Sequence, residues 1–117
     1  MADENPEIRK AIARIIRGLK GVEFGGAVGS MGQLLALWER VRADLVLIDL
    51  RLVSLDGFSA LRRLRTAPGL RVMLLTIHDG AELRAVAANG MADASICKWR
   101  IDREMRNEIA RLFPALN

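Results

Sequence analysis

The sequence has very few cysteine, histidine and aromatic residues, and these absences narrow what the protein can be. It has one cysteine and one histidine among 117 residues. Cys97 has no partner for an internal disulfide, and without other cysteines or nearby histidines it is a poor metal ligand. It is therefore predicted to be a buried core thiol. Aromatic residues make up only 4% of the chain, so Leu, Ile, Val, Ala and Met must fill the core.

Long apolar runs are missing as well. No run approaches the roughly 18 residues of a membrane-spanning helix, and no secretory signal peptide is recognisable. With a single cysteine, this pattern predicts a cytoplasmic protein that does not associate with membranes. The chain is still 51% hydrophobic, with a mean hydropathy of +0.17, which suits one folded domain over residues 1–117.

The charge balance is basic, with a net charge of +4 and a pI of about 10.2. Such a balance suits a nucleic-acid-binding protein, but the basic residues are scattered, and the densest group, 62–65, is predicted to be a solvated helix face. No helix-turn-helix pattern follows the final helix, and no aromatic stacking platform is present. The glycines at 25–32 do not have dinucleotide-binding spacing, and no Walker pattern occurs. Nucleic-acid and nucleotide binding are therefore alternatives that the sequence does not favour.

Hydrophobic periodicity predicts helices that alternate with strands. The expected helices are Pro6–Leu19, Ser30–Arg42, Gly57–Arg65, Asp79–Gly90 and Asp102–Phe113, with Val41 and Phe58 on buried faces. The expected strands are Val22–Val28, which contains two glycines, and Leu45–Leu50, Val72–Ile77 and Ala94–Lys98. This alternation predicts an α/β fold with a doubly wound parallel sheet. In such sheets functional sites gather at the carboxyl ends of the strands.

Chemically active side chains stand at those predicted strand ends. Asp49, Thr76 and Lys98 each lie at the end of an apolar strand, and Asp3 and Glu4 precede the first helix. A carboxylate in an apolar run is costly unless it finds partners. Clustered carboxylates suit Mg²⁺, which takes oxygen ligands, and aspartate is a nucleophile toward phosphoryl groups. The pattern indicates metal-assisted phosphoryl transfer, although acids before a helix, a strand threonine and a terminal lysine each also have an ordinary structural role.

Together these residues resemble the receiver domain of two-component response regulators. Residues 44–57, DLVLIDLRLVSLDG, are similar to the family's phosphoacceptor strand and loop. Residues 1–9 resemble its acidic pair and first helix, and residues 74–79 and 96–98 resemble its hydroxyl and lysine signatures. The resemblance covers essentially the whole chain. It implies a flavodoxin-like fold with strand order 2-1-3-4-5.

The resemblance also implies a role for each site residue. Asp49 is the phosphoacceptor, and a sensor histidine kinase or a phosphotransfer protein donates the phosphoryl group to it. The implied Mg²⁺ ligands are Asp3, Glu4, Asp49 and the backbone carbonyl of Arg51. Thr76 and Lys98 contact the phosphoryl group. The domain is then a signalling phosphoprotein that catalyses only its own phosphotransfer and dephosphorylation, rather than an enzyme acting on other substrates.

Phosphorylation in this family changes an interaction surface, here expected at Gly80–Gly90 and Ala94–Phe113. Ser95 occupies the switch position, where the family usually has an aromatic residue, and Val53, Ile77 and Trp99 also depart from the family pattern. These departures leave open an alternative, a degenerate receiver-like module that binds partners without phosphotransfer. A homodimer through the last helices, and an output domain that is fused or separate, are also left open.

The segment before the first helix is the least expected feature of the sequence. Almost nothing apolar precedes Asp3, although the first strand of this fold lies in the centre of the sheet. Loss of that strand would expose backbone hydrogen-bonding groups and one face of the core. The sequence leaves three explanations open: a truncated or misassigned start, a strand supplied by another chain, or a rearranged sheet.

Overall fold

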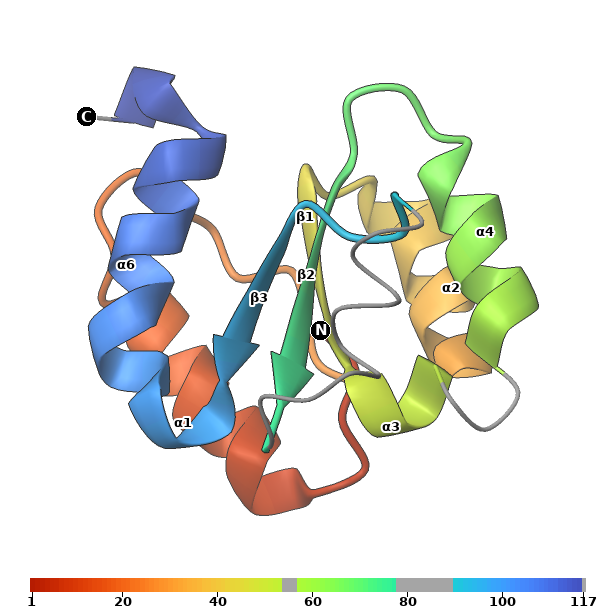
Figure 1. The fold of residues 1–117 in the computed structure, drawn as a ribbon, viewed down its shortest axis with the longest axis horizontal. Helices are drawn as coiled ribbons and strands as arrows, with labels where there is room; N and C mark the ends of the chain where they lie inside the picture. Colours follow the sequence, from red (N-terminus) through yellow and green to blue (C-terminus); the bar gives the residue numbers. More distant parts are fainter. Residues whose placement is uncertain (54–56, 78–89, 117) are drawn as a thin grey trace.

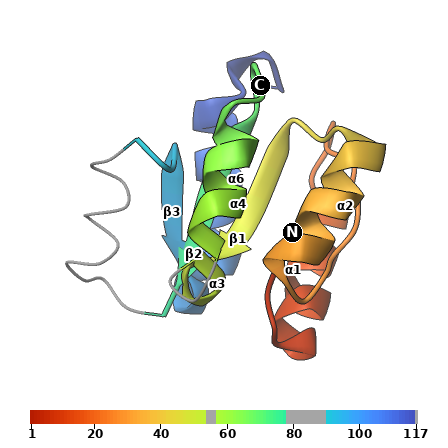
Figure 2. The ribbon, with the colours of Figure 1, turned by 90° about the vertical axis from the view of Figure 1, so that its right-hand side faces the viewer.

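The computed structural model describes residues 1–53, 57–77 and 90–116. Three parallel strands form the sheet in the order β1 (Leu45–Asp49), β2 (Arg71–Thr76), β3 (Ala94–Cys97). The helices that cover one face are α1 (Pro6–Arg17) and α6 (Ile101–Leu112), and those on the other are α2 (Met31–Val41) and α4 (Phe58–Arg65) (Figures 1 and 2). Short helical turns are α3 (Leu50–Leu52), η2 (Lys98–Arg100) and η3 (Pro114–Leu116). The predicted α/β class with a parallel sheet is confirmed.

The helix starts follow the polar residues in front of them. The Asn5 side chain accepts a hydrogen bond from the Glu7 N–H, and Pro6 opens α1, where no donor is needed. Ser30, predicted as a cap, accepts a hydrogen bond of 3.1 Å from the Gln33 N–H at the start of α2. Two of the predicted helix starts are therefore explained by local hydrogen bonding.

Each face of the sheet buries its own apolar cluster. Side chains alternate along a strand, so Val46 and Ile48 face α2 and α4, whereas Leu47 packs with α1 and α6. Because both faces are covered, the strands are apolar almost throughout. Cys97 is 8% exposed and is a free thiol, as predicted.

Residues 1–3 lie where a first strand is expected. Ala2 forms single parallel bridges to Ile48 on one side and to Val28 on the other. The Met1 amine donates a hydrogen bond of 2.9 Å to the Gly26 carbonyl, and burial lowers the pKa of this amine to about 6. Two single bridges do not establish five strands, so the predicted order 2-1-3-4-5 stays a prediction for the positions beyond β1, β2 and β3.

Several predicted details are wrong. Val22–Val28 is not a strand, because only Val28 is bridged and Gly26 has a φ of +138°, outside the extended region. Val41 and Phe58, predicted to be buried, are 43% and 40% exposed. Helical spacing placed them on the apolar face, but they lie at the last and first positions of their helices, at the margin of the core.

The final helix also begins differently from the prediction. Residues Lys98–Arg100 form a 3₁₀ turn that leads directly into α6 at Ile101. Asp102 therefore lies inside the first turn, where its charge suits the helix dipole, rather than capping the helix. The predicted helix Asp79–Gly90 lies outside the described residues except for Gly90.

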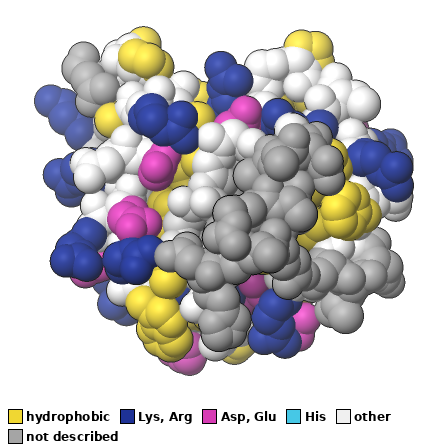
Figure 3. Space-filling model, viewed as in Figure 1, with side chains coloured by type: hydrophobic (Ala, Val, Ile, Leu, Met, Phe, Trp, Pro, Cys, Tyr) yellow, Lys and Arg dark blue, Asp and Glu magenta, His cyan; other side chains and the backbone are white. Residues whose placement is uncertain are grey.

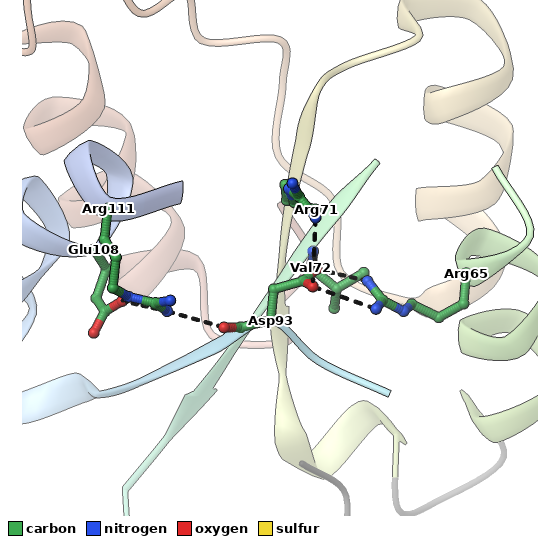
Figure 4. Close-up of polar contacts among 6 residues, drawn as sticks. All are labelled: Arg65, Arg71, Val72, Asp93, Glu108 and Arg111. Carbon is green, nitrogen blue, oxygen red and sulfur yellow. Dashed lines mark hydrogen bonds and ion pairs between the residues drawn. The ribbon is translucent and has the colours of Figure 1, made fainter. Parts of the chain in front are cut away.

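A polar network holds the amino end of the sheet (Figure 4). The Asp93 carboxylate accepts hydrogen bonds from both terminal nitrogens of Arg65, at 2.6 and 3.3 Å, and from the Val72 N–H at 2.8 Å. Its backbone carbonyl accepts a hydrogen bond of 2.9 Å from Arg111. Asp93 therefore joins α4, β2 and α6 at the start of β3.

Because Gly57 has no side chain, the backbone of Leu52 can lie close to it. A Cβ there would overlap the Leu52 carbonyl oxygen and lie 2.8 Å from Met31 Cγ. We expect Gly57→Ala to lower the free energy of unfolding, measured in urea, by about 1–3 kcal/mol. Gly32→Ala is the control, because a Cβ there meets nothing within 4 Å, and it should be neutral or slightly stabilising in α2. Equal losses in the two variants would contradict this assignment.

Candidate functional site

Lys98 lies between two buried acids at the carboxyl end of the sheet. Its Nζ is 2.6 Å from Asp3 Oδ2 and 3.3 Å from Asp49 Oδ1. The three side chains are 8%, 1% and 3% exposed, in that order. Two carboxylates this deeply buried would repel each other, so the ammonium group is the cation that makes their burial tolerable.

The backbone brings these three residues together from distant parts of the sequence. Asp49 is the last residue of β1, and Lys98 directly follows β3. The Asp49 N–H donates to the Ala2 carbonyl at 2.9 Å, and the Asp3 N–H donates to the Val28 carbonyl at 3.0 Å. The short segment 1–3 therefore places Asp3 beside the end of β1, as the predicted convergence of strand ends requires.

Nearby backbone donors orient one oxygen of each carboxylate. Asp3 Oδ1 accepts a hydrogen bond of 2.9 Å from the Asn5 N–H, and Asp49 Oδ1 accepts one of 3.3 Å from the Arg51 N–H. Asp3 Oδ2 is buried and has no hydrogen bond of good geometry within the described part of the chain. It forms an ion pair of 2.6 Å with the Lys98 Nζ. Asp3 and Asp49 thus share one ammonium group, and the formal excess of one negative charge favours the uptake of a further cation.

Arg9 stabilises the loop that carries Asp3. Its Nη1 donates to the Asp3 carbonyl at 2.7 Å and to the Glu4 carbonyl at 3.0 Å. Arg9 is the last residue of the segment 1–9 that resembles the family, and no role was predicted for it. The available signal was its position in the first turn of a helix, from which a long side chain can reach back to the preceding loop.

The remaining predicted residues lie at or near the same edge of the sheet. A cavity of about 410 Å³ is lined by Asp3, Glu4, Asn5, Ile8, Arg51, Ile77, Lys98 and Trp99. Thr76 ends β2, is 5% exposed, and pairs with Cys97, the residue before Lys98. Ser95 is exposed in the middle of β3 and does not line this cavity.

The donor set fits a magnesium ion with few protein ligands. Mg²⁺ is commonly held by one or two carboxylates and several waters. Asp3 and Asp49 supply two carboxylates around one cation position, and the adjoining cavity has room for water. Glu4 is exposed, and no group of three Asp, Glu, His or Cys close enough to hold a metal occurs in residues 1–53, 57–77 and 90–116. Asp56, His78 and Asp79 lie outside these ranges.

Basic side chains do not gather into one patch on the visible face. Lys and Arg are spread around the molecule over several elements in Figure 3. Several of the arginines are already engaged with acids, as Arg65 is with Asp93 and Arg100 with Glu104. The basic residues are scattered, as expected from the sequence, and form no continuous nucleic-acid-binding surface on this face.

Comparison with known proteins decides the family. A profile of the response regulator receiver domain matches residues 1–110. The chain belongs to the response regulator receiver domain family. The predicted family, the receiver domain of two-component response regulators, is thereby confirmed.

Relatives and solved structures agree with this assignment. The cyclic di-GMP phosphodiesterase response regulator RpfG of Xanthomonas campestris is 30% identical over 110 residues, which is 91% of this chain and 28% of that protein. The probable transcriptional regulatory protein TcrX of Mycobacterium tuberculosis is 29% identical over 99 residues, 84% of this chain and 42% of the relative. A CheY-like receiver domain protein from Methanospirillum hungatei superposes with a TM-score of 0.81 at 23% identity, covering 98% of this chain and 91% of that structure.

The receiver domain is shorter than its curated relatives. It spans 20% of a protein-glutamate methylesterase/protein-glutamine glutaminase from Paramagnetospirillum magneticum, to which it is 32% identical over 75 residues, 63% of this chain. The activities of such longer proteins are therefore not assigned to it. Within the described residues, no helix is both long and apolar enough to cross a bilayer. The cytoplasmic location stays a prediction.

Proposed function

We propose that this receiver domain accepts a phosphoryl group on Asp49 from a histidine kinase or a phosphotransfer protein, in a reaction that requires Mg²⁺. The observation that carries the proposal is the buried Asp49 carboxylate, bound at 3.3 Å by a lysine that also binds a second buried acid, Asp3. A structural ion pair needs one acid for each base. A second acid on the same ammonium leaves a formal excess of negative charge, which is better explained by a site that takes up another cation.

The proposed nucleophile is Oδ2 of Asp49. Lys98 and the Arg51 N–H both contact Oδ1, so we assign the attack on phosphorus to the other oxygen. The new bond joins Oδ2 to phosphorus while the bond from phosphorus to the donor imidazole breaks, and that imidazole takes up a proton. Lys98 then contacts a phosphoryl oxygen, and the hydroxyl of Thr76 bonds to another.

The proposed metal ligands are Asp3, Glu4, Asp49 and the backbone carbonyl of Arg51. When bound, Mg²⁺ would neutralise charge on the transferring group. Asp3 and Asp49 are oriented by backbone donors, whereas Glu4 is exposed, lines the cavity and would reach the metal through its longer side chain. Arg9 holds the carbonyl groups of Asp3 and Glu4, so it fixes the loop from which both acids project.

Phosphorylation would change the surface around β3 and the start of α6. It replaces the single negative charge of the Asp49 carboxylate with a phosphoryl group that carries about −1.5 to −2, and this group competes for the Lys98 ammonium that now binds Asp3. Trp99, which follows Lys98, is 78% exposed and lies on that surface. We propose that an output domain, fused or separate, or a second copy bound through the last helices responds to this change. Ser95, at the proposed switch position, is exposed in β3.

A receiver-like module without phosphotransfer is not favoured. The acid–lysine set is intact, and the departures at Val53 and Ile77 do not disturb it: Val53 is buried in the core and Ile77 is 39% exposed at the cavity.

Incubation with acetyl phosphate tests the proposal. With excess Mg²⁺, intact-protein mass spectrometry should show a gain of one phosphoryl group, and prior addition of EDTA should suppress it. Arg9→Ala should slow the gain without abolishing it, because the loop loses its two anchoring hydrogen bonds while every ligand remains. A wild-type protein that folds but gains no mass would refute the proposed function.

A further inference from the structure

Trp99 is a large aromatic residue that contributes little to the packing of the fold. It is 78% exposed, and within residues 1–53, 57–77 and 90–116 it forms no side-chain hydrogen bond and no cation–π contact. The other tryptophan, Trp38, is engaged in both ways. Its indole N–H donates to the Ala43 carbonyl at 3.2 Å, and the Arg42 guanidinium lies 4.5 Å from its ring. A tryptophan left in water stabilises a fold little, so the position of Trp99 needs another explanation.

The side chain lies at the cavity of the functional site. Trp99 lines the cavity of about 410 Å³ together with Lys98, whose Nζ is 3.3 Å from Asp49 Oδ1. Five large apolar residues are exposed in the described part of the chain, and two of them, Ile77 and Trp99, line this cavity. The buried side chains of Asp3 and Lys98 line it as well. The cavity therefore has a charged inner part and an apolar outer part.

The backbone on both sides of Trp99 is held in place. Lys98 forms ion pairs with two buried acids, and Arg100 forms one of 2.7 Å with Glu104. Ile101, the first residue of α6, is buried. Trp99 is the middle residue of the η2 turn, so its ring can move mainly about its own side-chain bonds. A contact surface that is already held in position loses little conformational freedom when a ligand binds.

We propose that Trp99 and Ile77 bind the imidazole ring of the phosphodonor and so make the domain selective for a phosphorylated imidazole over an acyl phosphate. This inference rests on the proposed function. The phosphoryl group is charged and belongs beside Lys98, whereas the leaving group of an in-line transfer lies on the outer side of the phosphorus. An imidazole presents a flat aromatic face there, which can stack on an indole. The acetate that leaves acetyl phosphate has no ring.

Trp99 takes no part in the exchange of bonds. The bond from Asp49 Oδ2 to phosphorus forms while the bond from phosphorus to the ring nitrogen breaks. That nitrogen keeps the electron pair of the broken bond and takes up a proton from solvent, so the products are an aspartyl phosphate and a free imidazole. Trp99 and Ile77 act only by binding the ring, and they are specificity-determining residues.

Two small phosphodonors test this inference. Phosphoimidazole has the ring of phosphohistidine, and acetyl phosphate has no ring. The wild type and Trp99→Ala would be incubated with each donor, below saturation and with Mg²⁺, and the rate of mass gain measured. Trp99→Ala should react about three- to tenfold more slowly with phosphoimidazole, which is the loss expected for one aromatic contact. Its rate with acetyl phosphate should change by less than about twofold, because that donor does not use the contact.

Two further variants control for other effects of the substitution. Trp99→Phe keeps an aromatic face and should retain most of the rate with phosphoimidazole. Phe58→Ala also removes an exposed aromatic side chain, but Phe58, which is 40% exposed, does not line the cavity. Neither rate should change in this variant. Urea midpoints measured for all the variants identify any rate loss that comes from a weakened fold.

The outcomes separate this inference from the proposed function. Equal losses with both donors, no loss with phosphoimidazole, or a Trp99→Phe variant as slow as Trp99→Ala would each overturn the inference. So would a wild type that gains mass from acetyl phosphate but not from phosphoimidazole. In all these cases a mass gain of the wild type with acetyl phosphate would still support the proposed function. A wild type that gains mass from neither donor would overturn both.

Discussion

Lys98→Ala is expected to lower the free energy of unfolding by about 3–5 kcal/mol when divalent metal is absent. Lys98 is the cation that the structure places within 4 Å of both Asp3 and Asp49. Without it, two buried carboxylates face each other across a small space. The loss can be measured by urea denaturation in the presence of EDTA.

The stabilisation by Mg²⁺ distinguishes this explanation from a simple loss of packing. If the two acids form a cation site, Mg²⁺ should stabilise Lys98→Ala more than it stabilises the wild type, because the ion replaces the missing charge. The control is Lys10→Ala, which removes an exposed lysine 3.5 Å from Glu7 and should change stability by less than about 1 kcal/mol. A Lys98 variant as stable as the Lys10 variant, or equally unresponsive to Mg²⁺, would contradict the assignment.

Asp93→Ala is the second substitution with a large expected effect, a loss of about 2–4 kcal/mol. It removes the acceptor of two Arg65 hydrogen bonds and of the Val72 N–H, which is left without this partner in the sheet. Asp102→Ala is the control because this acid is exposed in the first turn of α6, and it should cost less than about 1 kcal/mol. Similar urea midpoints for the two variants would show that the network is not important for stability.

The same residue makes stability depend on pH. Burial alone would raise the pKa of Asp93, but the hydrogen bonds from Arg65 and Val72, and the positive charges of Arg65 and Arg71, outweigh it and hold the pKa below its usual value. A lowered carboxyl pKa contributes stability that is present above the ordinary aspartate value, about 4, and is lost as the pH falls toward the folded pKa. Between pH 6 and pH 3 the wild type should therefore lose more stability than Asp93→Ala. A parallel loss in both would contradict this account.

Much of the fold could be predicted because its strongest signals are local and periodic. β1 and β2 are short apolar runs, and a polar residue at the end of each marks the functional edge of the sheet. The convergence of Asp3, Asp49 and Lys98 followed from the rule that parallel strands end at one edge. Their contacts confirm that these three residues lie together, whereas the roles of Glu4, Arg51 and Thr76 stay predictions.

The errors arose where tertiary position outweighs local pattern. Phe58 has helical spacing with Leu61 and Leu64, but it is the first residue of α4 and is 40% exposed. Asp102 is a good capping residue in isolation, yet the 3₁₀ turn before it leads into α6 at Ile101, so the cap position falls at Arg100 instead. The role of Ala2 could not be predicted, because a single bridged residue has no periodicity to detect.

The most direct test of the account is the location of the phosphoryl group. Wild type, Asp49→Ala and Asp44→Ala would each be incubated with Mg²⁺ and acetyl phosphate and measured by intact-protein mass spectrometry. Asp44 is an exposed aspartate just before β1, so its variant controls for removal of an acid from the same segment. We expect a gain of one phosphoryl group in the wild type and in Asp44→Ala, and none in Asp49→Ala. A gain that persists in Asp49→Ala, or its absence from the wild type, would contradict the central claim.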